Sequence, residues 1–140
     1  MIEQITVFLE NKEGRLTALC KTLGDAGINM HALTVADTAD FGLVRIIADD
    51  PQRAVDVLQT AGYRAALTKV AAIQVPNEPG GLARLLETLD SLDVNIEYGY
   101  CFSMGADFSV DVLKVHHSGE VVSAIEAAGF RVLTNEDICA

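Results

Sequence analysis

The sequence is short of basic residues. Its 140 residues include 10 lysines and arginines against 20 aspartates and glutamates, which gives a formal net charge of -10 at pH 7. A surface of this charge repels the phosphate backbone of nucleic acids and the anionic surface of a membrane. We therefore expect neither nucleic acid nor membrane as a partner, and expect a small ligand instead.

The chain also lacks a secretion signal and a long apolar run. No basic segment leads into an apolar one at the N-terminus, and the longest apolar stretches are interrupted by Lys69 or Gln74. We expect the protein to remain in the cytoplasm.

Signals for disulfides and metals are equally sparse. Cys20, Cys101 and Cys139 are odd in number, far apart, and form no C-x-x-C motif, so we expect reduced thiols rather than a disulfide framework or a zinc site. His116 and His117 are adjacent at the end of a predicted strand, where neighbouring side chains point to opposite faces, and we expect a solvated pair. The sequence predicts no metal and no cofactor.

What the chain does contain is an internal repeat. Residues 11–30 and 77–96 align without a gap at a spacing of 66 and are identical at 7 of 20 positions. The shared leucines have the i, i+3, i+7 spacing of a buried helix face. The shared asparagines and glycine lie outside the helix, where packing does not require them, and are therefore the candidates for function. The identical pairs are Asn11/Asn77, Gly14/Gly80, Leu16/Leu82, Leu19/Leu85, Thr22/Thr88, Leu23/Leu89 and Asn29/Asn95.

Apolar periodicity predicts the same order of elements in both copies, strand–helix–strand–strand–helix–strand. The first copy has predicted strands at 4–9, 28–36, 42–48 and 64–68 and helices at 14–24 and 51–61, with a polar connection at 37–40. The second has strands at 71–75, 94–103, 107–115 and 129–133 and helices at 81–92 and 118–128.

This order folds into a four-stranded antiparallel sheet with both helices on one face. The predicted fold is α+β, with two ferredoxin-like βαββαβ modules at 1–69 and 70–140 and a linker of almost no length at 69–70. A module this small buries only about 60% of its unfolded surface, so we expect the modules to pack together or to form a homodimer.

The candidate binding residues flank the first helix of each copy. One asparagine (Asn11 or Asn77) ends the first strand, and a second (Asn29 or Asn95) begins the next. We expect these places to meet at one edge of the module, beside the unpaired N–H groups of the helix N-terminus. Such N–H groups suit a carboxylate, and carboxamides suit an ammonium or a polar side chain. An α-amino acid offers both groups on one carbon.

These motifs resemble those of the ACT domain family, which has N-x-P-G-x-L before the first helix and I/V-N-I at the second strand. The second copy has both, as NEPGGL at 77–82 and VNI at 94–96, whereas the first has NKEGRL at 11–16 and INM at 28–30 and lacks the proline. The resemblance covers 5–67 and 71–134. It implies a regulatory, non-enzymatic role.

By the same resemblance, the four asparagines hold a free amino acid between two paired domains. Family members usually carry the domain fused to a catalytic one, so the implied partner here is a separate metabolic enzyme or regulator. The candidate ligand-binding residues are Asn11, Gly14, Arg15, Leu16, Asn29, Met30, Asn77, Pro79, Gly80, Gly81, Leu82, Asn95 and Ile96.

The two predicted sites are unequal. Pro79 fixes its φ at about -65° and orders the second turn in advance, while Gly81 leaves the helix start open. Arg15, at the place of Gly81, either covers the first pocket or grips a ligand carboxylate. We expect the site of Asn77 and Asn95 to be the stronger.

Other functions on this fold are less well supported. In an acylphosphatase-like enzyme on this fold, Arg15 and Asn29 would be the catalytic pair. However, Gly81 replaces the arginine in the second copy, and the sequence run with which that family binds phosphate is absent. An RNA-recognition reading lacks aromatics at the stacking positions and has the wrong charge. The remaining alternative is a protein–protein interaction module with degenerate ligand sites, since an asparagine beside a helix is often only a cap or turn residue.

Two further groups of residues bear on the site. Tyr98, Tyr100 and Phe102 share a strand face and are expected in a core or an interface. His31 and Glu97, each two residues past a motif asparagine, either line the pocket or face solvent.

Overall fold

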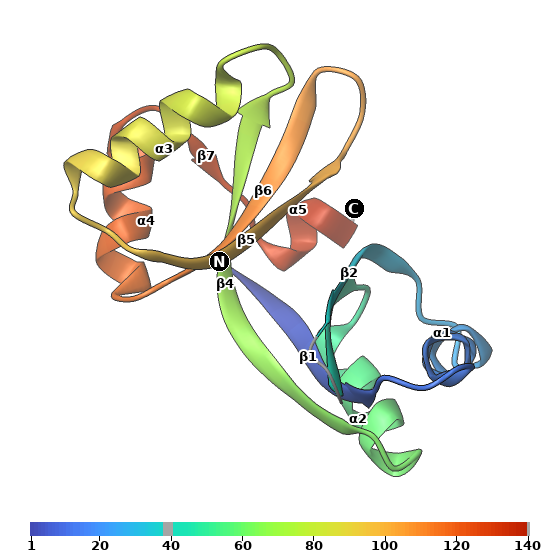
Figure 1. Cartoon of the computed structure of the whole chain (residues 1–140). Coiled ribbons are helices and arrows are strands. Elements are labelled where there is room, and N and C mark those ends of the chain that lie inside the picture. The colour runs from blue at the N-terminus through green and yellow to red at the C-terminus, as the bar shows by residue number, and fades with distance from the viewer. Residues whose placement is uncertain (38–40, 140) are drawn as a thin grey trace. The chain divides into compact units, whose positions relative to one another are not determined.

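The computed structural model describes residues 1–37 and 41–139 (Figure 1). Two compact units form: Glu3–Thr68, called module 1, and Lys69–Ala140 with Met1–Ile2, called module 2. The elements in chain order are β1 (Ile2–Glu10), α1 (Arg15–Asp25), β2 (Met30–Asp37), β3 (Phe41–Ala48), α2 (Pro51–Thr60), β4 (Arg64–Pro76), α3 (Gly81–Ser91), β5 (Ile96–Ser103), β6 (Phe108–Val115), α4 (Ser118–Ala127), β7 (Arg131–Val132) and α5 (Asn135–Cys139).

Module 1 has the strand order β2-β3-β1-β4, and β3 is antiparallel to both β1 and β2. The alternation in β1 places Ile5, Val7 and Leu9 in the core, as predicted. There they pack with the leucine stripe of α1, of which Leu19 and Leu23 are fully buried.

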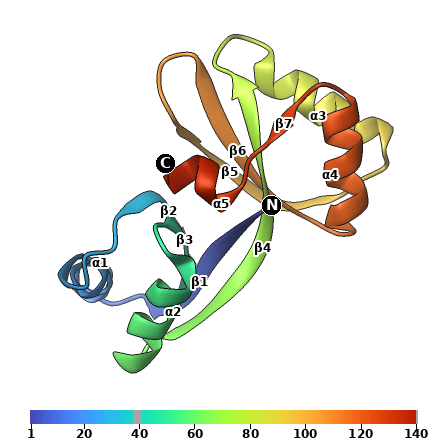
Figure 2. The same cartoon turned by 180° about the vertical axis from the view of Figure 1, so that it is seen from behind.

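Module 2 repeats this arrangement, with β5-β6-β4 in order and β7 on the far side of β4. Its core joins alternate residues of β4 and β6 to the buried faces of α3 and α4. Figure 2 shows α3 and α4 on the same side of this sheet. The predicted pair of ferredoxin-like modules, with antiparallel sheets and helices on one face, is confirmed.

The modules are joined by a continuous strand, where the sequence predicted a linker of almost no length. β4 is one strand of 13 residues that serves as the last strand of module 1 and the first strand of module 2. Lys69 and Val70 belong to this strand because no glycine, proline or turn residue interrupts it, and Val70 is buried.

The short helix α5 was not predicted. Thr134 begins it, since the backbone N–H and hydroxyl of Thr134 donate to Asp137 Oδ2 at 2.9 and 3.1 Å, and the N–H of Asp137 donates back to the threonine hydroxyl at 3.3 Å. This T-x-x-D spacing is a capping signal that is readable in the sequence.

The predicted polar connection falls partly on residues 38–40, which lie outside the described residues. In the part of the chain that is described, no helix has the length and apolar character needed to cross a membrane.

Candidate functional site

The turn before the first helix has the same backbone frame in both modules. Gly14 and Gly80 have φ of 81° and 84°, a left-handed conformation that favours glycine. Within the described residues, neither α1 nor α3 has a side-chain cap. Apart from the N–H groups of Arg15 and Gly81, which donate to backbone carbonyls of the turn, those of the first helical turn are left for another acceptor. The matching backbone hydrogen bonds run from Lys12 to Glu10 (2.8 Å), Glu78 to Pro76 (2.9 Å), Arg15 to Lys12 (3.2 Å) and Gly81 to Glu78 (3.1 Å).

The two asparagines of a module do not meet. Because β1 and β2 both run antiparallel to β3, they are parallel to each other, and the end of β1 lies at the opposite end of the sheet from the start of β2. Asn11 follows Glu10, which pairs with Phe41, whereas the Asn29 carbonyl accepts from Asp49 N at 3.0 Å. The 8 residues of β3 separate these places by about 24 Å. The prediction that they share one edge is therefore wrong.

Module 2 has the same separation. Asn77 lies beside the β5–β6 connection, where its N–H donates to Asp107 O at 2.9 Å and its Nδ2 donates to Ala106 O at 3.2 Å. Asn95 precedes Ile96, which pairs with Val115 at the other end of β6. Asn77 is thus held in place by the neighbouring loop, through its backbone N–H and its side-chain Nδ2.

The other predicted residues divide between surface and core. Leu16 and Leu82 are 37% and 46% exposed in the first turns of α1 and α3. Met30 and Ile96 instead pack against the cores of their modules. Pro79 lies in the exposed turn that precedes Gly80.

The first residue of the helix differs between the modules for a packing reason. Gly81 is buried, and a Cβ at this position would overlap the carbonyl oxygen of Pro76. Arg15, at the matching place, carries a half-exposed guanidinium 3.6 Å from Glu10 Oε2, an oxygen that also lies 3.2 Å from Lys12 Nζ.

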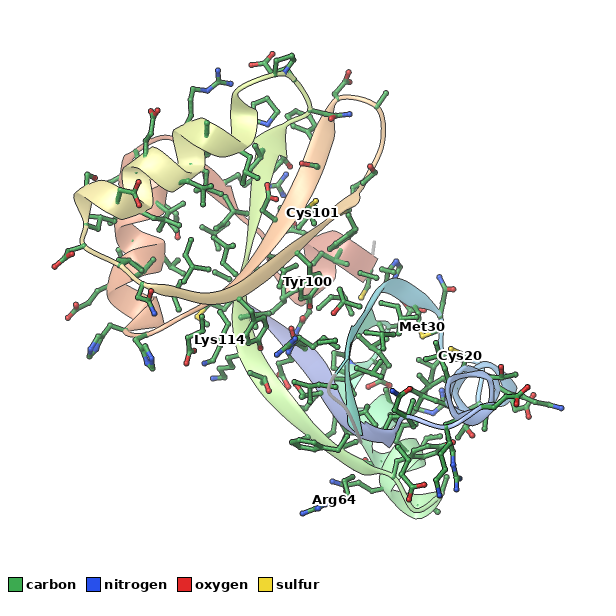
Figure 3. The ribbon with its side chains drawn as sticks, viewed as in Figure 1. Cys20, Met30, Arg64, Tyr100, Cys101 and Lys114 are labelled. Carbon is green, nitrogen blue, oxygen red and sulfur yellow. The ribbon has the colours of Figure 1, made fainter. Side chains whose placement is uncertain are left out.

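Arg15 borders a cavity of about 420 Å³ in module 1. The same cavity is lined by Arg64, which the sequence reading missed, and whose guanidinium lies 5.9 Å from the ring centre of Phe8. Arg64 extends outward from β4 in Figure 3. Two guanidinium groups therefore border one cavity beside the first turn. Its lining is Phe8, Leu9, Glu10, Arg15, Ala61, Gly62, Tyr63 and Arg64.

A second cavity, of about 350 Å³, lies in module 2 beside Asn95. His116 and His117 both line it, and both are exposed, as was predicted for a solvated pair. The alternation of a strand no longer applies there, because β6 ends at Val115 and His117 adopts a φ of 53° before α4. The remaining lining residues are Leu92, Asp93, Val94, Glu120, Val121 and Ala124.

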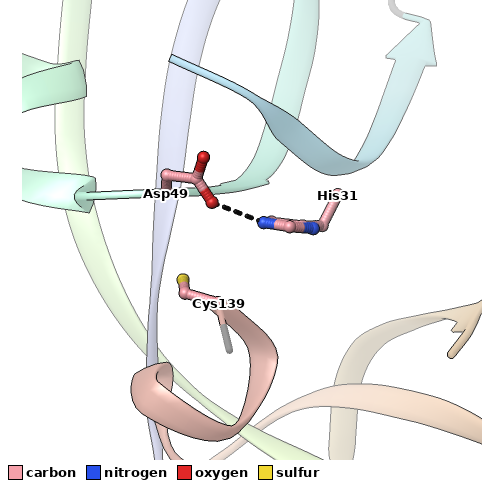
Figure 4. Close-up of side chains that lie close together, drawn as sticks. All are labelled: His31, Asp49 and Cys139. Carbon is pink, nitrogen blue, oxygen red and sulfur yellow. Dashed lines mark hydrogen bonds and ion pairs between the residues drawn. The ribbon is translucent and has the colours of Figure 1, made fainter.

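Each module also ties the start of its second strand to the end of its third by a histidine–carboxylate pair. In module 1, His31 Nε2 lies 2.6 Å from Asp49 Oδ1 (Figure 4). In module 2, His116 Nε2 lies 3.3 Å from Glu97 Oε1. His31 and Glu97 match in the repeat, and both fall where the strand register shifts, a β-bulge that turns a side chain out of the regular alternation.

These features define a tandem of ferredoxin-like modules, each with an uncapped helix start behind an asparagine–glycine turn. The chain belongs to the ACT domain pair family, whose model matches residues 1–137. The predicted family is confirmed.

Solved structures agree with this assignment. A protein from Bacteroides thetaiotaomicron is 34% identical, with a TM-score of 0.92 over 98% of this chain and 94% of that chain. The regulatory subunit of aspartate kinase from Thermus thermophilus, in its ligand-free form, is 16% identical, with a TM-score of 0.68 over 91% and 92%. The same subunit from Thermus flavus has 16% identity and a TM-score of 0.61 over 90% and 91%. At these identities the last two show the fold alone. The search of curated proteins gave no match.

Proposed function

We propose that this protein is a sensor that binds a free α-amino acid and regulates a metabolic protein. The observation that carries the proposal is the duplicated turn, with Gly14 or Gly80 in the same left-handed conformation before a helix that has no side-chain cap in the described residues. A carboxylate fits the exposed N–H groups of such a helix start. The names of the aspartate kinase subunits support a regulatory role.

The separation of the asparagines requires two modules for one site. A ligand the size of an amino acid cannot span the ~24 Å between Asn77 and Asn95 of one module. We therefore assign the turn of one module and the second-strand start of another to each site, with the second module contributed by a second copy of the chain in a homodimer.

Apolar surface on an edge strand supports the pairing. β2 is first in the strand order of module 1, and its Leu33 and Val35 are 39% and 51% exposed. The same surface also favours the competing function, an interaction module whose asparagines no longer bind a ligand.

Thermal-shift screening of the twenty amino acids tests the proposal. A ligand at ~100 Kd that binds only the native state adds about 2.7 kcal/mol to the free energy of unfolding. With an unfolding entropy of ~2.1 cal/mol/K per residue, the melting temperature rises by roughly 9 °C. Flat melting curves for all twenty, confirmed by calorimetry, would favour the interaction module.

Subunit mixing tests the shared site. Asn77→Ala and Asn95→Ala should each weaken binding at the module 2 sites of their own homodimers by about 10-fold to 150-fold. Mixed dimers of the two variants should regain one intact site, because one copy keeps Asn77 and the other keeps Asn95. If mixing restores no binding, the partner module is not that of a second copy.

A further inference from the structure

Asp111 is a buried carboxyl with an unsatisfied oxygen. Asp111 is 5% exposed, and its Oδ2 has no hydrogen-bond partner among the described residues. It lies on the helix-facing side of β6, since Leu113 and Val115, two and four residues on, belong to the core of module 2. Burial raises the pKa of this carboxyl above its usual value. A buried polar group without a partner lowers stability and calls for an explanation.

The sister module shows that the fold does not need a carboxyl here. The residue of β3 that matches Asp111 is Val44, which is fully buried and pairs with Val35 on the edge strand. In module 2, Asp111 pairs with Cys101 on β5 instead. The next cross-strand pair on this face differs in the same way. Leu33 on β2 of module 1 is matched by the smaller Gly99 on β5 of module 2. Module 2 thus has smaller side chains and one acid where module 1 has an apolar surface.

Asp111 has a buried neighbour on one adjacent strand and an exposed neighbour on the other. On β4 it pairs with Ile73, which is fully buried, and on β5 it pairs with Cys101, which is exposed (Figure 3). β5 is the last strand in the sheet order, so this side is also the edge at which another module would pair.

We propose that Asp111 binds the side-chain cation of a basic amino acid and so determines which ligand module 2 accepts. This inference rests on the proposed function. A carboxylate without a basic partner attracts a cation strongly where water is excluded, and the net charge of -10 favours the approach of cations.

The length of the ligand follows from the register. Phe108 pairs with Pro76, directly before Asn77 and the turn, and Asp111 lies three residues further along β6. At ~3.4 Å per residue, the backbone of Asp111 lies about 10 Å along the sheet from the end of β4 that leads into the turn, where the ligand carboxylate is assigned. The α-ammonium is too close to that carboxylate to reach Asp111, whereas the terminal charges of lysine, ornithine and arginine lie several bonds further out.

Calorimetry and thermal shift on the full chain test the proposal. Lysine, ornithine and arginine are compared with norleucine and glutamine, which have chains of similar length without the charge. Wild type should bind the basic amino acids more tightly. Asp111→Asn keeps the shape and removes the charge, and should weaken lysine binding by about 10-fold to 150-fold.

Two further variants separate the role of Asp111 in binding from its role in stability. Asp111→Val copies Val44 of module 1 and should raise the melting temperature without ligand while abolishing the preference for lysine over norleucine. Asp90→Asn removes one charge from the exposed face of α3 and should change neither quantity.

The outcomes are distinguishable. If lysine and norleucine stabilise wild type equally, or if Asp111→Asn binds lysine as wild type does, the assignment of Asp111 is wrong while amino-acid sensing stands. If no amino acid binds wild type, the proposed function fails and this inference fails with it.

Discussion

His31 Nε2 lies 2.6 Å from Asp49 Oδ1, and the matching pair in module 2 has its chemical types exchanged, with Glu97 in place of the histidine and His116 in place of the aspartate. The carboxylate and the imidazole have exchanged positions between the two strands, while the contact between them is present in both modules. Such an exchange indicates that the link itself is used in both modules, to hold the bulged start of the second strand beside the motif asparagine.

This relationship gives a prediction for stability. Asp49→Ala should lower the free energy of unfolding by about 1 kcal/mol, the usual effect of losing one partly exposed hydrogen bond. The double variant His31→Glu/Asp49→His reproduces the arrangement of module 2 and should recover most of that loss. Urea denaturation measures both. If the double variant is less stable than Asp49→Ala, the exchange between the modules does not reflect an equivalent link.

Gly81 provides a second prediction. A methyl group at this position would overlap the carbonyl oxygen of Pro76, so Gly81→Ala should lower the free energy of unfolding by about 1 to 3 kcal/mol. The matched control is Gly24→Ala in α1, where a Cβ would meet no described atom within 4 Å beyond its chain neighbours and its own helix backbone. This control should stabilise the chain by about 0.5 to 1 kcal/mol, because alanine is the better helix former. A loss of stability in both variants would show that the contact with Pro76 is not the cause.

The repeat, the strand alternation and the leucine stripes were readable from the sequence, because burial imposes a period on each element. Ile5, Val7 and Leu9 lie in the core as their spacing predicts. The relation between Asn11 and Asn29 was not readable from periodicity. It depends on the direction in which β1 and β2 run relative to β3, which is a property of the assembled sheet.

Asp111 illustrates a second limit of sequence reading. The alternation of β6 marks its position as buried, yet an acid there contradicts the pattern. The comparison with Val44 shows that module 1 has an apolar residue at the matching position. The bulges at His31 and Glu97 also escaped prediction, since one extra residue in a strand leaves no mark in its apolar pattern. Local violations of pattern are expected where a chain carries function.

The two proposed sites should differ in strength, and the site of Asn95 should be the stronger. Pro79 restricts the second turn before ligand arrives, and Asn77 is fixed by its bond to Ala106 O. Losing a carboxamide that contacts a charged group costs about 1.5 to 3 kcal/mol, or roughly 10-fold to 150-fold in affinity. Asn95→Ala should therefore remove most of the thermal shift, and Asn29→Ala should leave much of it.

Arg15 is the control for this ranking. If its guanidinium, which lies near Glu10, covers the first site, Arg15→Gly should strengthen binding there. Titrations in which Asn29→Ala loses more affinity than Asn95→Ala, and in which Arg15→Gly loses affinity as well, would make Arg15 a ligand contact and reverse the order of the two sites.

Asp111 and Asp137 should make the free energy of unfolding depend on pH in opposite directions. Burial raises the pKa of Asp111, whereas the hydrogen bonds from Thr134, with the nearby Arg131 guanidinium, lower the pKa of Asp137. Stability rises with pH wherever the unfolded chain binds more protons than the native state. Above the ordinary aspartate value of 3.8, native Asp111 keeps a proton that the unfolded chain has released, so this group makes the free energy of unfolding fall as pH rises through its raised pKa. Below 3.8, native Asp137 stays ionised while the unfolded chain takes up a proton, so its contribution is lost as pH falls through its lowered pKa.

Urea denaturation between pH 3 and 7 separates the two contributions. Relative to wild type, Asp111→Asn should become more stable as pH rises above ~3.9, because it lacks the carboxyl that must ionise in a buried place. Asp137→Asn should be less stable than wild type near neutral pH, and the difference should shrink toward the acid end, where wild type loses the same interaction. Parallel curves for wild type and Asp111→Asn would show that this carboxyl ionises as easily in the native state as in the unfolded chain.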